Sequence, residues 1–349
     1  MKNEPTIIEG GYLRDILEQP LALKVTLAGL ECPAALEGAA KRLRDCGFER
    51  IVLTAMGGSY WALQPLHLDL LQGGYPSLLI ETSELIHYTP ALLDSKTLVI
   101  ANSQSGHSVE MRRLLEMKRP DCFTIAVTNT PDSPLAQRSD ILLETRAGSE
   151  HTVSCKTWVT ALMALKWLAD ALNGRSLERS QEELATAAPA VAGYLSGWRG
   201  HVQEAIAQLE GVRNYFLLGR GRSMAAVGTG GLITKEAAHI HSEGMSAAAF
   251  RHGPFEMIDG GFFALVFEGD ASTASLNRRL AEDIVRAGGR AAVVGEAADF
   301  DVFRLPKVAE SVRPIVEILP VEMVTLAFGA IAGREAGKFE RATKITSEE

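Results

Sequence analysis

The sequence predicts an α/β protein in which helices cover parallel sheets on both faces. Short apolar runs, such as Leu98 to Ala101, alternate with helical patterns, and this alternation is typical of βαβ units. The order of strand, Gly- and Ser-rich turn and helix at residues 50–71 returns from residue 214 onward, which indicates an internal duplication. A chain of 349 residues is long enough for two such domains.

The first 48 residues are predicted to be largely helical. Residues 12–20 form an amphipathic helix that stops at Pro20, and residues 34–46 form a second helix with Gly47 as its C-cap. A helix is also expected at residues 109–117. Five apolar runs are predicted to be the strands of one parallel sheet, at residues 50–56, 77–80, 97–101, 123–128 and 141–144.

The second half of the chain is predicted to repeat this order. A long apolar helix at residues 157–172 leads into a polar and then Ala-rich segment that joins the two halves. Three strands, a closing helix and a polar tail are then expected, at residues 214–218, 261–267, 290–294, 320–337 and 338–349. We therefore expect an N-terminal helical segment (1–30), two domains (31–175 and 195–335) and a C-terminal tail (336–349).

Composition excludes several classes of protein. The net charge of -8 and the lack of a Lys/Arg run argue against a nucleic-acid partner. The N-terminus has no apolar core of a secretory signal, and no uncharged apolar stretch is long enough to span a bilayer, so no membrane partner is expected. We expect a cytoplasmic protein whose four cysteines are free thiols, and neither Cys nor His spacing predicts a metal site.

One stretch, residues 97–108, carries the clearest chemical signal. A buried strand runs into Ser103-Gln-Ser-Gly-His-Ser108, and a helical pattern follows directly. Hydroxyls, backbone N–H groups and the positive end of a helix dipole together can bind a phosphate monoester without a lysine. An ordinary Ser-Gly turn that caps a helix is the alternative interpretation. The second half has Glu268 to Thr273 in the corresponding place, where two carboxylates would repel a phosphate.

Several further motifs stand in register along the chain. They are Ile16-Leu-Glu-Gln-Pro20, Met56-Gly-Gly-Ser-Tyr60, Ala147-Gly-Ser-Glu150 with Lys156, Glu236, Ile240-His-Ser-Glu243 and Arg251-His-Gly-Pro254. With the Ser103–Ser108 stretch, they resemble the tandem sugar isomerase (SIS) domain family, and most of all the isomerase half of glucosamine-6-phosphate synthase (glutamine:fructose-6-phosphate aminotransferase). The resemblance implies two three-layer αβα SIS domains, each with a flavodoxin-like parallel sheet of five strands.

The resemblance also implies a set of site residues and no cofactor. The first SIS domain would bind the phosphosugar, and the second would carry the catalytic Glu/His segment. A sugar-contacting residue carries over onto Ser154, with Cys155 as the alternative. Phosphate ligands carry over onto Ser59, Ser103, Gln104, Ser105 and Ser108, and catalytic residues onto Glu236, His252 and Lys344.

Three departures from the synthase bear on the reaction. Ile233 stands where the synthase has a lysine, and Gly58, in the sugar-binding part of the site, stands where it has a hydroxyl. No glutaminase domain precedes the pair of SIS domains, so we expect that glutamine is not the source of ammonia.

The residue types fit the chemistry of aldose–ketose interconversion. That reaction needs a base over two adjacent carbons and a group that opens the sugar ring. A partly desolvated Glu236 suits the first task and His252 the second; the alternatives are a surface glutamate paired with Lys235 and a histidine that only hydrogen-bonds in its turn. Lys344 is either catalytic or a solvated residue of the tail, and His239 and His241 are expected to be packing or supporting groups.

Two classes of function fit these features. The first is an enzyme without glutamine as a substrate: a phosphosugar isomerase, a deaminase that releases ammonia from an amino-sugar phosphate, or a deglycase. The second is a non-catalytic sugar-phosphate sensor, since SIS domains also serve in regulators. We favour the enzyme because Glu236 and His252 are both present and no DNA-binding segment is evident. The resemblance further implies a homodimer whose active sites are shared between subunits.

Overall fold

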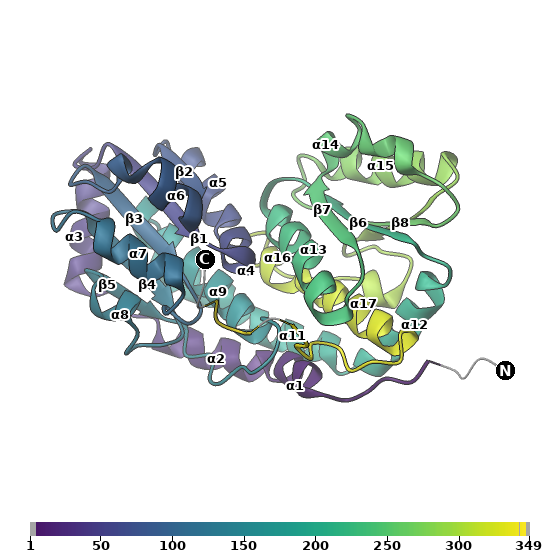
Figure 1. Cartoon of the computed structure of the whole chain (residues 1–349). Helices are drawn as coiled ribbons and strands as arrows, with labels where there is room; N and C mark the ends of the chain where they lie inside the picture. Colours follow the sequence, from purple (N-terminus) through teal and green to yellow (C-terminus); the bar gives the residue numbers. More distant parts are fainter. Residues whose placement is uncertain (1–4, 342, 347–349) are drawn as a thin grey trace. The chain divides into compact units, whose positions relative to one another are not determined.

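The computed structural model describes residues 5–341 and 343–346, which form two compact units (Figure 1). The first-sheet unit comprises residues 21–150, 156–186 and 343–346. The second-sheet unit comprises residues 5–20, 151–155 and 187–341. The C-terminal segment 343–346 therefore belongs with the first sheet, although it follows the second sheet in the sequence.

The first-sheet unit has the five parallel strands that the sequence predicts. They run in the order β2-β1-β3-β4-β5, and every residue of the central strand β3 is buried, because helices cover both faces. The strands are β1 (Arg50–Ala55), β2 (Ser77–Glu81), β3 (Thr97–Asn102), β4 (Phe123–Thr128) and β5 (Ile141–Glu144).

The helices of this unit form two layers. Val52 and Val99 pack against α6 and α7 on one face of the sheet, and α3, α5 and α9 pack together around the other. The helices are α2 (Gln19–Gly29), α3 (Ala34–Arg44), α4 (Gly57–Ala62), α5 (Gln64–Gln72), α6 (Thr82–Tyr88), α7 (Val109–Met117), α8 (Pro134–Gln137), α9 (Lys156–Asn173) and α10 (Leu177–Ala185), with the 3₁₀ turn η1 (Pro90–Leu92).

Two local predictions for the N-terminal region were wrong. Pro20 does not end the helical region, because α2 begins at Gln19 and a proline is well tolerated in the first turn of a helix. Gly47 is not the left-handed residue after α3: Cys46 is, with φ 57°. The N–H of Gly47 instead bonds the carbonyl of Arg42 at 2.8 Å.

The second-sheet unit repeats the strand order with four parallel strands, β7-β6-β8-β9. The resemblance implied a fifth strand, and in the described residues its place is taken by a single parallel bridge between Gly295 and Arg304. The pairing does not extend, because Asp301–Phe303 form a 3₁₀ turn in which the Phe303 N–H bonds the carbonyl of Phe300. The strands are β6 (Asn214–Gly219), β7 (Ser242–Ser246), β8 (Phe262–Phe267) and β9 (Arg290–Val294).

Close backbone packing sets the position of the helix that follows β6. A Cβ on Gly231 or on Gly244 would run into backbone atoms of the facing element, so α13 lies directly against β7. The helices of this unit are α1 (Gly11–Leu17), α11 (Ala187–Leu195), α12 (Trp198–Leu209), α13 (Met224–Ala238), α14 (Ala247–Phe250), α15 (Ala274–Arg286), α16 (Arg313–Val316) and α17 (Ile318–Ile331), with the 3₁₀ turns η2 (Gly221–Ser223), η3 (Pro254–Met257) and η4 (Asp301–Phe303).

The segment Arg313–Ile331, which includes α16 and α17, is apolar enough by length and composition to cross a membrane, with a mean hydropathy of 1.7. It is not free of charge, since it contains Glu317 and Glu322. Within its unit 94% of the apolar window is buried, and it packs against α12 and α13. This is the environment of a core helix, so the segment is weak evidence for a membrane span.

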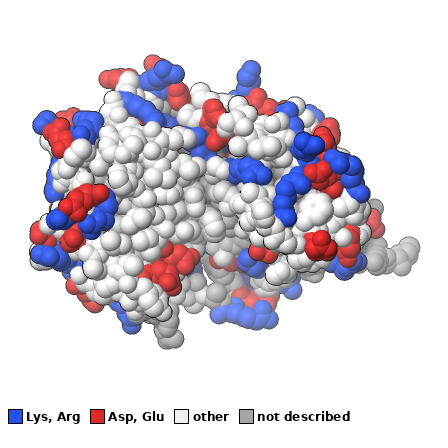
Figure 2. Space-filling view, turned by 90° about the horizontal axis from the view of Figure 1, so that it is seen from above, with Lys and Arg blue, Asp and Glu red and all other residues white. Residues whose placement is uncertain are grey.

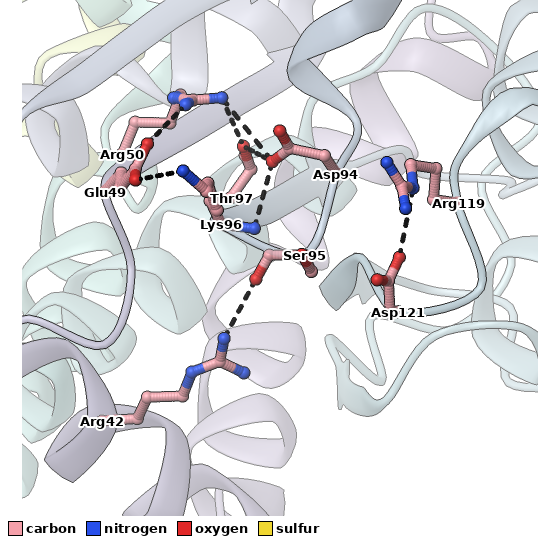
Figure 3. A network of polar contacts seen from close by, with 9 residues as sticks. All are labelled: Arg42, Glu49, Arg50, Asp94, Ser95, Lys96, Thr97, Arg119 and Asp121. Atoms are coloured by element: carbon pink, nitrogen blue, oxygen red, sulfur yellow. Dashed lines mark hydrogen bonds and ion pairs between the residues drawn. The ribbon is translucent and has the colours of Figure 1, made fainter.

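A network of charged side chains lies at the amino ends of β1 and β3 (Figure 3). Glu49 contacts Lys96 at 2.6 Å and Arg50 at 2.9 Å, and Arg50 also lies 3.6 Å from Asp94. Glu49 and Lys96 are exposed and Arg50 and Asp94 are half-buried, so these pairs at the surface contribute little to stability. The polar loops that concern function lie at the opposite, carboxyl ends of the same strands.

Candidate functional site

Two short segments follow the carboxyl ends of β1 and β3, and a hydrogen bond joins them. The side-chain amide of Asn102 donates to the carbonyl of Ser59 at 2.9 Å. The indole N–H of Trp158 donates to the carbonyl of Gly58, also at 2.9 Å, so α9 supports the same segment. Because β1 and β3 are neighbouring parallel strands, Ser59 lies beside the Ser103–Ser108 loop, as the sequence predicts.

Three serines of the loop support its own backbone. The Oγ of Ser103 accepts the Gly106 N–H at 3.2 Å, and the Oγ of Ser105 accepts the His107 N–H at 3.2 Å. Ser108 is the N-cap of α7, where its Oγ accepts the Met111 N–H at 3.4 Å. A hydroxyl that accepts in this way keeps its own proton to donate, so all three can still donate to a ligand.

The loop also presents backbone donors. The backbone N–H groups of Gln104, Ser105 and Ser108 donate a hydrogen bond to no acceptor in the part of the chain that the structure describes. They lie at or just before the N-terminus of α7, where the helix dipole favours negative charge. Gly106 makes the turn with φ 63°, and a Cβ there would run into Ser133. Hydroxyls and N–H groups arranged in this way are suited to an anion, and we call residues 103–108 the cradle.

The C-terminal segment is held at this cradle. The carbonyl of Thr346 accepts the N–H of Val109, the first residue of α7, at 3.3 Å. The ammonium of Lys344 lies 2.7 Å from the Oε2 of Glu150, a carboxylate that is fully buried. Lys344 is therefore bound within the first-sheet unit rather than solvated.

Glu150 was not predicted as a site residue, yet it organises this part of the unit. Its carboxylate accepts the N–H of Thr157 at 3.0 Å and the hydroxyl of Thr157 at 2.6 Å, and so caps the N-terminus of α9. A glutamate a few residues before a long helix was the sequence signal that could have identified it. The bridge to Lys344 depends on two segments 194 residues apart, which no local pattern reveals.

The remaining predicted site residues belong to the second-sheet unit, so the structure describes them apart from the cradle. Glu236 is half-buried in the last turn of α13, and the ammonium of Lys235 donates to the Ser242 carbonyl at 3.0 Å. His252 is exposed in the turn after α14, where its N–H bonds the Ala249 carbonyl at 2.9 Å. Ser154 is half-buried, and its rival Cys155 is buried.

His239 ends α13 in the left-handed conformation, with φ 57°. Its Nδ1 contacts Arg334 and lies 4.0 Å from the Glu340 carboxylate, within the same unit. It therefore joins the end of α13 to the segment after α17, a supporting role of the kind that the sequence predicts.

In the second-sheet unit, the loop after β8 corresponds to the cradle, and acidic side chains lie there. Asp270, in the loop after β8, lies 3.3 Å from Arg222 in the loop after β6. The hydroxyl of Ser223 donates to Glu317 at 2.8 Å, and Glu317 is 1% exposed. Burial raises the pKa of Glu317 to about 7 and also raises the pKa of Asp270. These acidic groups make the loop after β8 unsuited to a phosphate.

The described residues contain no group of three or more His, Cys, Asp or Glu side chains that could hold a metal ion. Cys32, Cys46, Cys122 and Cys155 are free thiols, and burial raises the pKa of Cys122 to about 11. A buried thiol of that kind is unreactive.

Comparison with known proteins identifies the domain that contains the cradle. Residues 43–171 match the family model of the SIS domain. Residues 43–171 form an SIS domain. Over 345 residues, which cover 93% of the chain, the sequence is 29% identical to the isomerizing glutamine–fructose-6-phosphate aminotransferase of Pyrococcus horikoshii. The chain is homologous to the isomerase portion of such enzymes and spans about half of their length, 56% in this case.

Solved structures agree on the fold around the SIS domain. The C-terminal domain of glucosamine-fructose-6-phosphate aminotransferase from Francisella tularensis has a TM-score of 0.83 at 23% identity, with 95% of this chain and 98% of that chain covered. Glucosamine-6-phosphate deaminase from Thermotoga maritima has a TM-score of 0.79 at 19% identity, with coverage of 97% and 100%. Both solved structures thus share the fold of nearly the whole chain, including the parts outside residues 43–171.

Proposed function

We propose that the chain is an enzyme that acts on a hexose 6-phosphate derivative and transfers a proton between C1 and C2 of the sugar. The observation that carries the proposal is the cradle at α7, where three serine hydroxyls and three N–H groups without an acceptor among the described residues lie in one loop. A phosphate dianion suits such a site, because the donors and the helix dipole compensate its charge without a buried lysine.

The catalytic roles in the proposal follow the resemblance. Glu236 takes the proton from one carbon and returns it to the other through an enediol or enolamine, and His252 opens the sugar ring. Lys344 is held at the cradle by Glu150, within the unit that binds the phosphate, which supports a role for it at the substrate. Ser59 and Gln104 complete the phosphate site, and Gly58 and Ser154 contact the sugar.

Two reactions fit these groups. In an isomerase the enediol collapses to the other carbonyl, and nothing leaves. In a deaminase the enolamine of an amino-sugar phosphate becomes an imine, and water then releases ammonia. The relative from Pyrococcus horikoshii is named an isomerizing aminotransferase and the neighbour from Thermotoga maritima a deaminase, which supports both. Ile233, in place of the synthase lysine, favours a reaction without glutamine, and a deglycase would use the same proton transfer.

The experiment uses a panel of hexose and amino-hexose 6-phosphates in deuterated water. Proton NMR would follow isomers and deuterium at C1 and C2, and a coupled assay would follow ammonia, with and without glutamine. We expect deuterium incorporation with at least one sugar, its loss in Glu236→Gln, and no dependence on glutamine.

A sensor is the second candidate, since SIS domains also bind sugar phosphates without turnover. Tight binding without isomer, ammonia or deuterium exchange would select it and would reject the enzyme. We place the reaction in the cytoplasm, where four free thiols stay reduced. We also propose that the active form is a homodimer, with His252 supplied to the site by the second subunit.

A further inference from the structure

The turn that carries His252 begins as a short helix directly after β7. Ser246 is the N-cap of α14, where its Oγ accepts the N–H of Ala249 at 3.0 Å. The N–H of His252 bonds the Ala249 carbonyl at 2.9 Å and so continues the last turn of this helix. His252 is exposed, and its imidazole makes no hydrogen bond, ion pair or ring contact with the described residues. The backbone of the turn therefore has to set the position of this ring.

The residues on either side of His252 differ in how firmly they are held. Gly253 follows with φ 137°, and it has no side chain that could anchor the turn. Phe250, two residues before His252, is fully buried, and its ring lies 5.6 Å from the rings of Phe216 and Phe262. The position of the imidazole thus depends on the anchors that precede the glycine.

Arg251 supplies a second anchor, on a different element. Its guanidinium contacts the carboxylate of Asp283 in α15, 32 residues further along the chain. Asp283 also lies 2.6 Å from Arg286 of the same helix. The hydrogen bond from Arg251 is the main reason that the pKa of Asp283 lies below its usual range, so the carboxylate is charged at neutral pH. Asp283 thus joins the turn to α15 through a charged contact.

The helix α15 is a firm base for this contact. It packs against β8 and β9, and Leu280 and Ile284 belong to the same core cluster as Phe250. Viewed from above, the surface over α14 and α15, at the right of the view, shows blue and red side chains next to one another (Figure 2). The apolar contact of Phe250 and the charged contact of Arg251 therefore tie two successive residues of the turn to one packed layer.

We propose that Asp283 is a positioning residue for His252. Through Arg251 it fixes the turn that carries the imidazole. The inference rests on the proposed function, in which His252 opens the sugar ring. A displacement of about 1 Å at a catalytic group can cost roughly a hundredfold in rate. The contact therefore acts on catalysis, even though an ion pair near the surface adds little to stability.

The step that depends on this position is a proton transfer. A protonated His252 gives a proton to the ring oxygen while the bond from that oxygen to the anomeric carbon breaks, and the electron pair of the bond stays on the ring oxygen. The anomeric hydroxyl gives its proton to water as its oxygen forms the carbonyl, and the imidazole takes a proton back from solvent. A sugar that is already open-chain needs none of these transfers, so its turnover does not depend on where His252 lies.

The test compares a ketohexose 6-phosphate that the wild type turns over with its 5-deoxy analogue. The analogue cannot close a ring, because its 5-hydroxyl is absent and its 6-hydroxyl carries the phosphate. Proton NMR follows deuterium incorporation at C1 of both sugars, with ammonium present so that a deaminase can run in reverse. His252→Ala is the reference variant: it should slow the exchange of the ring-forming sugar and not that of the analogue.

Asp283→Ala should lower kcat for the ring-forming sugar about tenfold or more and leave the rate for the open-chain analogue nearly unchanged. Asp283→Glu keeps the carboxylate and should retain most of the rate. A double variant with Arg251→Ala should be no slower than Asp283→Ala, because both changes break the same contact. Glu282→Ala is the matched control, since Glu282 is the adjacent carboxylate of α15 and is exposed; it should leave both rates unchanged.

A wild-type rate of Asp283→Ala with the ring-forming sugar would overturn the inference, and so would an equal loss with both sugars. A second readout needs no turnover: the amide of His252 should exchange with deuterium about tenfold faster in Asp283→Ala, and unchanged exchange would also overturn the inference. A wild type that turns over no sugar would reject the proposed function, and the amide exchange would then still decide whether Asp283 holds the turn. Circular dichroism would verify that the variants are folded.

Discussion

At the scale of single residues, the serines of the cradle support the fold and keep groups that a ligand can bind. Ser103 and Ser105 accept N–H groups of their own loop and so hold it in shape. Their hydroxyl protons remain available for a ligand, as does the N–H of Ser105. A substitution that keeps the loop's shape but adds a charge therefore tests binding rather than folding.

Ser105→Asp should weaken the binding of any sugar phosphate by roughly 100-fold or more, because two negative charges a few ångströms apart repel by several kcal/mol in a partly buried site. Isothermal titration calorimetry measures this affinity. Ser275→Asp, in the first turn of α15, controls for a new carboxylate at an exposed helix N-terminus and should leave affinity unchanged. Equal affinity of Ser105→Asp and wild type would show that the phosphate binds elsewhere.

Glu317 couples the stability of the second-sheet unit to pH. It is fully buried, Ser223 donates to one carboxylate oxygen, and the other oxygen has no partner among the described residues. Burial raises its pKa from 4.5 to about 7. The folded state thus holds a proton more tightly than the unfolded state, so this contribution to stability is complete below pH 4.5 and is lost as the pH rises through 7.

Glu317→Gln should remove this dependence, since an amide does not titrate. From pH 5 to pH 8, the free energy of unfolding measured with urea should fall by about 2–3 kcal/mol more in the wild type than in the variant. Glu256→Gln, at an exposed site of the same unit, should keep the wild-type pH profile. The same loss in Glu317→Gln as in the wild type would mean that Glu317 does not titrate in this range.

At the scale of elements, the C-terminal segment 343–346 is bound to the helices beside the cradle. It is joined to α7 through Thr346 and Val109, and to the start of α9 through Lys344 and Glu150. The ion pair is largely withdrawn from water, so removal of Lys344 takes one cation from the buried Glu150 carboxylate, which keeps its hydrogen bonds from Thr157. Tertiary contacts thereby hold Lys344 in the same unit as the proposed phosphate site, in a segment whose own sequence is that of a solvated tail.

Lys344→Ala should release this segment. We expect the amide of Val109 to exchange with deuterium at least tenfold faster, because its acceptor, the Thr346 carbonyl, is no longer held in place. Lys338→Ala, at an exposed lysine just before the segment, should leave the exchange unchanged. Protection of Val109 that persists in Lys344→Ala would show that the ion pair does not hold the segment.

At the scale of the whole molecule, two copies of one topology have diverged. Both sheets place a Gly-containing turn after each of their two central strands, at Gly57 and Gly106 in the first sheet and at Gly221 and Gly269 in the second. Serines follow in the first copy, and a paired Arg222 and Asp270 stand in the second. One copy is thus suited to an anion, while the other carries the proposed catalytic residues Glu236 and His252.

A mixed dimer tests whether the proposed sites are shared between subunits. Glu236→Ala and His252→Ala homodimers should each be nearly inactive. When the two are unfolded and refolded together in equal amounts, about half of the dimers are mixed, and in each of these one site carries both lesions and the other none. Roughly a quarter of all sites should then recover activity. No recovery, with mixed dimers shown to be present, would place His252 in its own subunit's site or outside catalysis.

The local patterns of the sequence were sufficient for most of the fold and for the cradle. The strands β1, β3 and β4 of the first sheet are buried on both faces, which requires continuous apolar runs. Ser103 to Ser108 lie in one loop whose turn and cap residues act on their neighbours. Such features depend on interactions a few residues apart, so their signal is present in the sequence itself. The short polar strand β7 lacks that signal and was missed, because its place is set by close packing against α13.

Long-range contacts decided the rest. Glu150 and Lys344 are 194 residues apart, and the sequence alone offers no reason to pair a polar tail with a buried carboxylate. Glu317 was not singled out, since its burial depends on how α16 and α17 pack against β6 and the turn after it rather than on any neighbour in the sequence. The contact of Arg251 with Asp283 likewise exists only once α14 and α15 are packed on the same sheet. Ionisation, burial and exposure are properties of tertiary packing, and here they determine which charged groups meet.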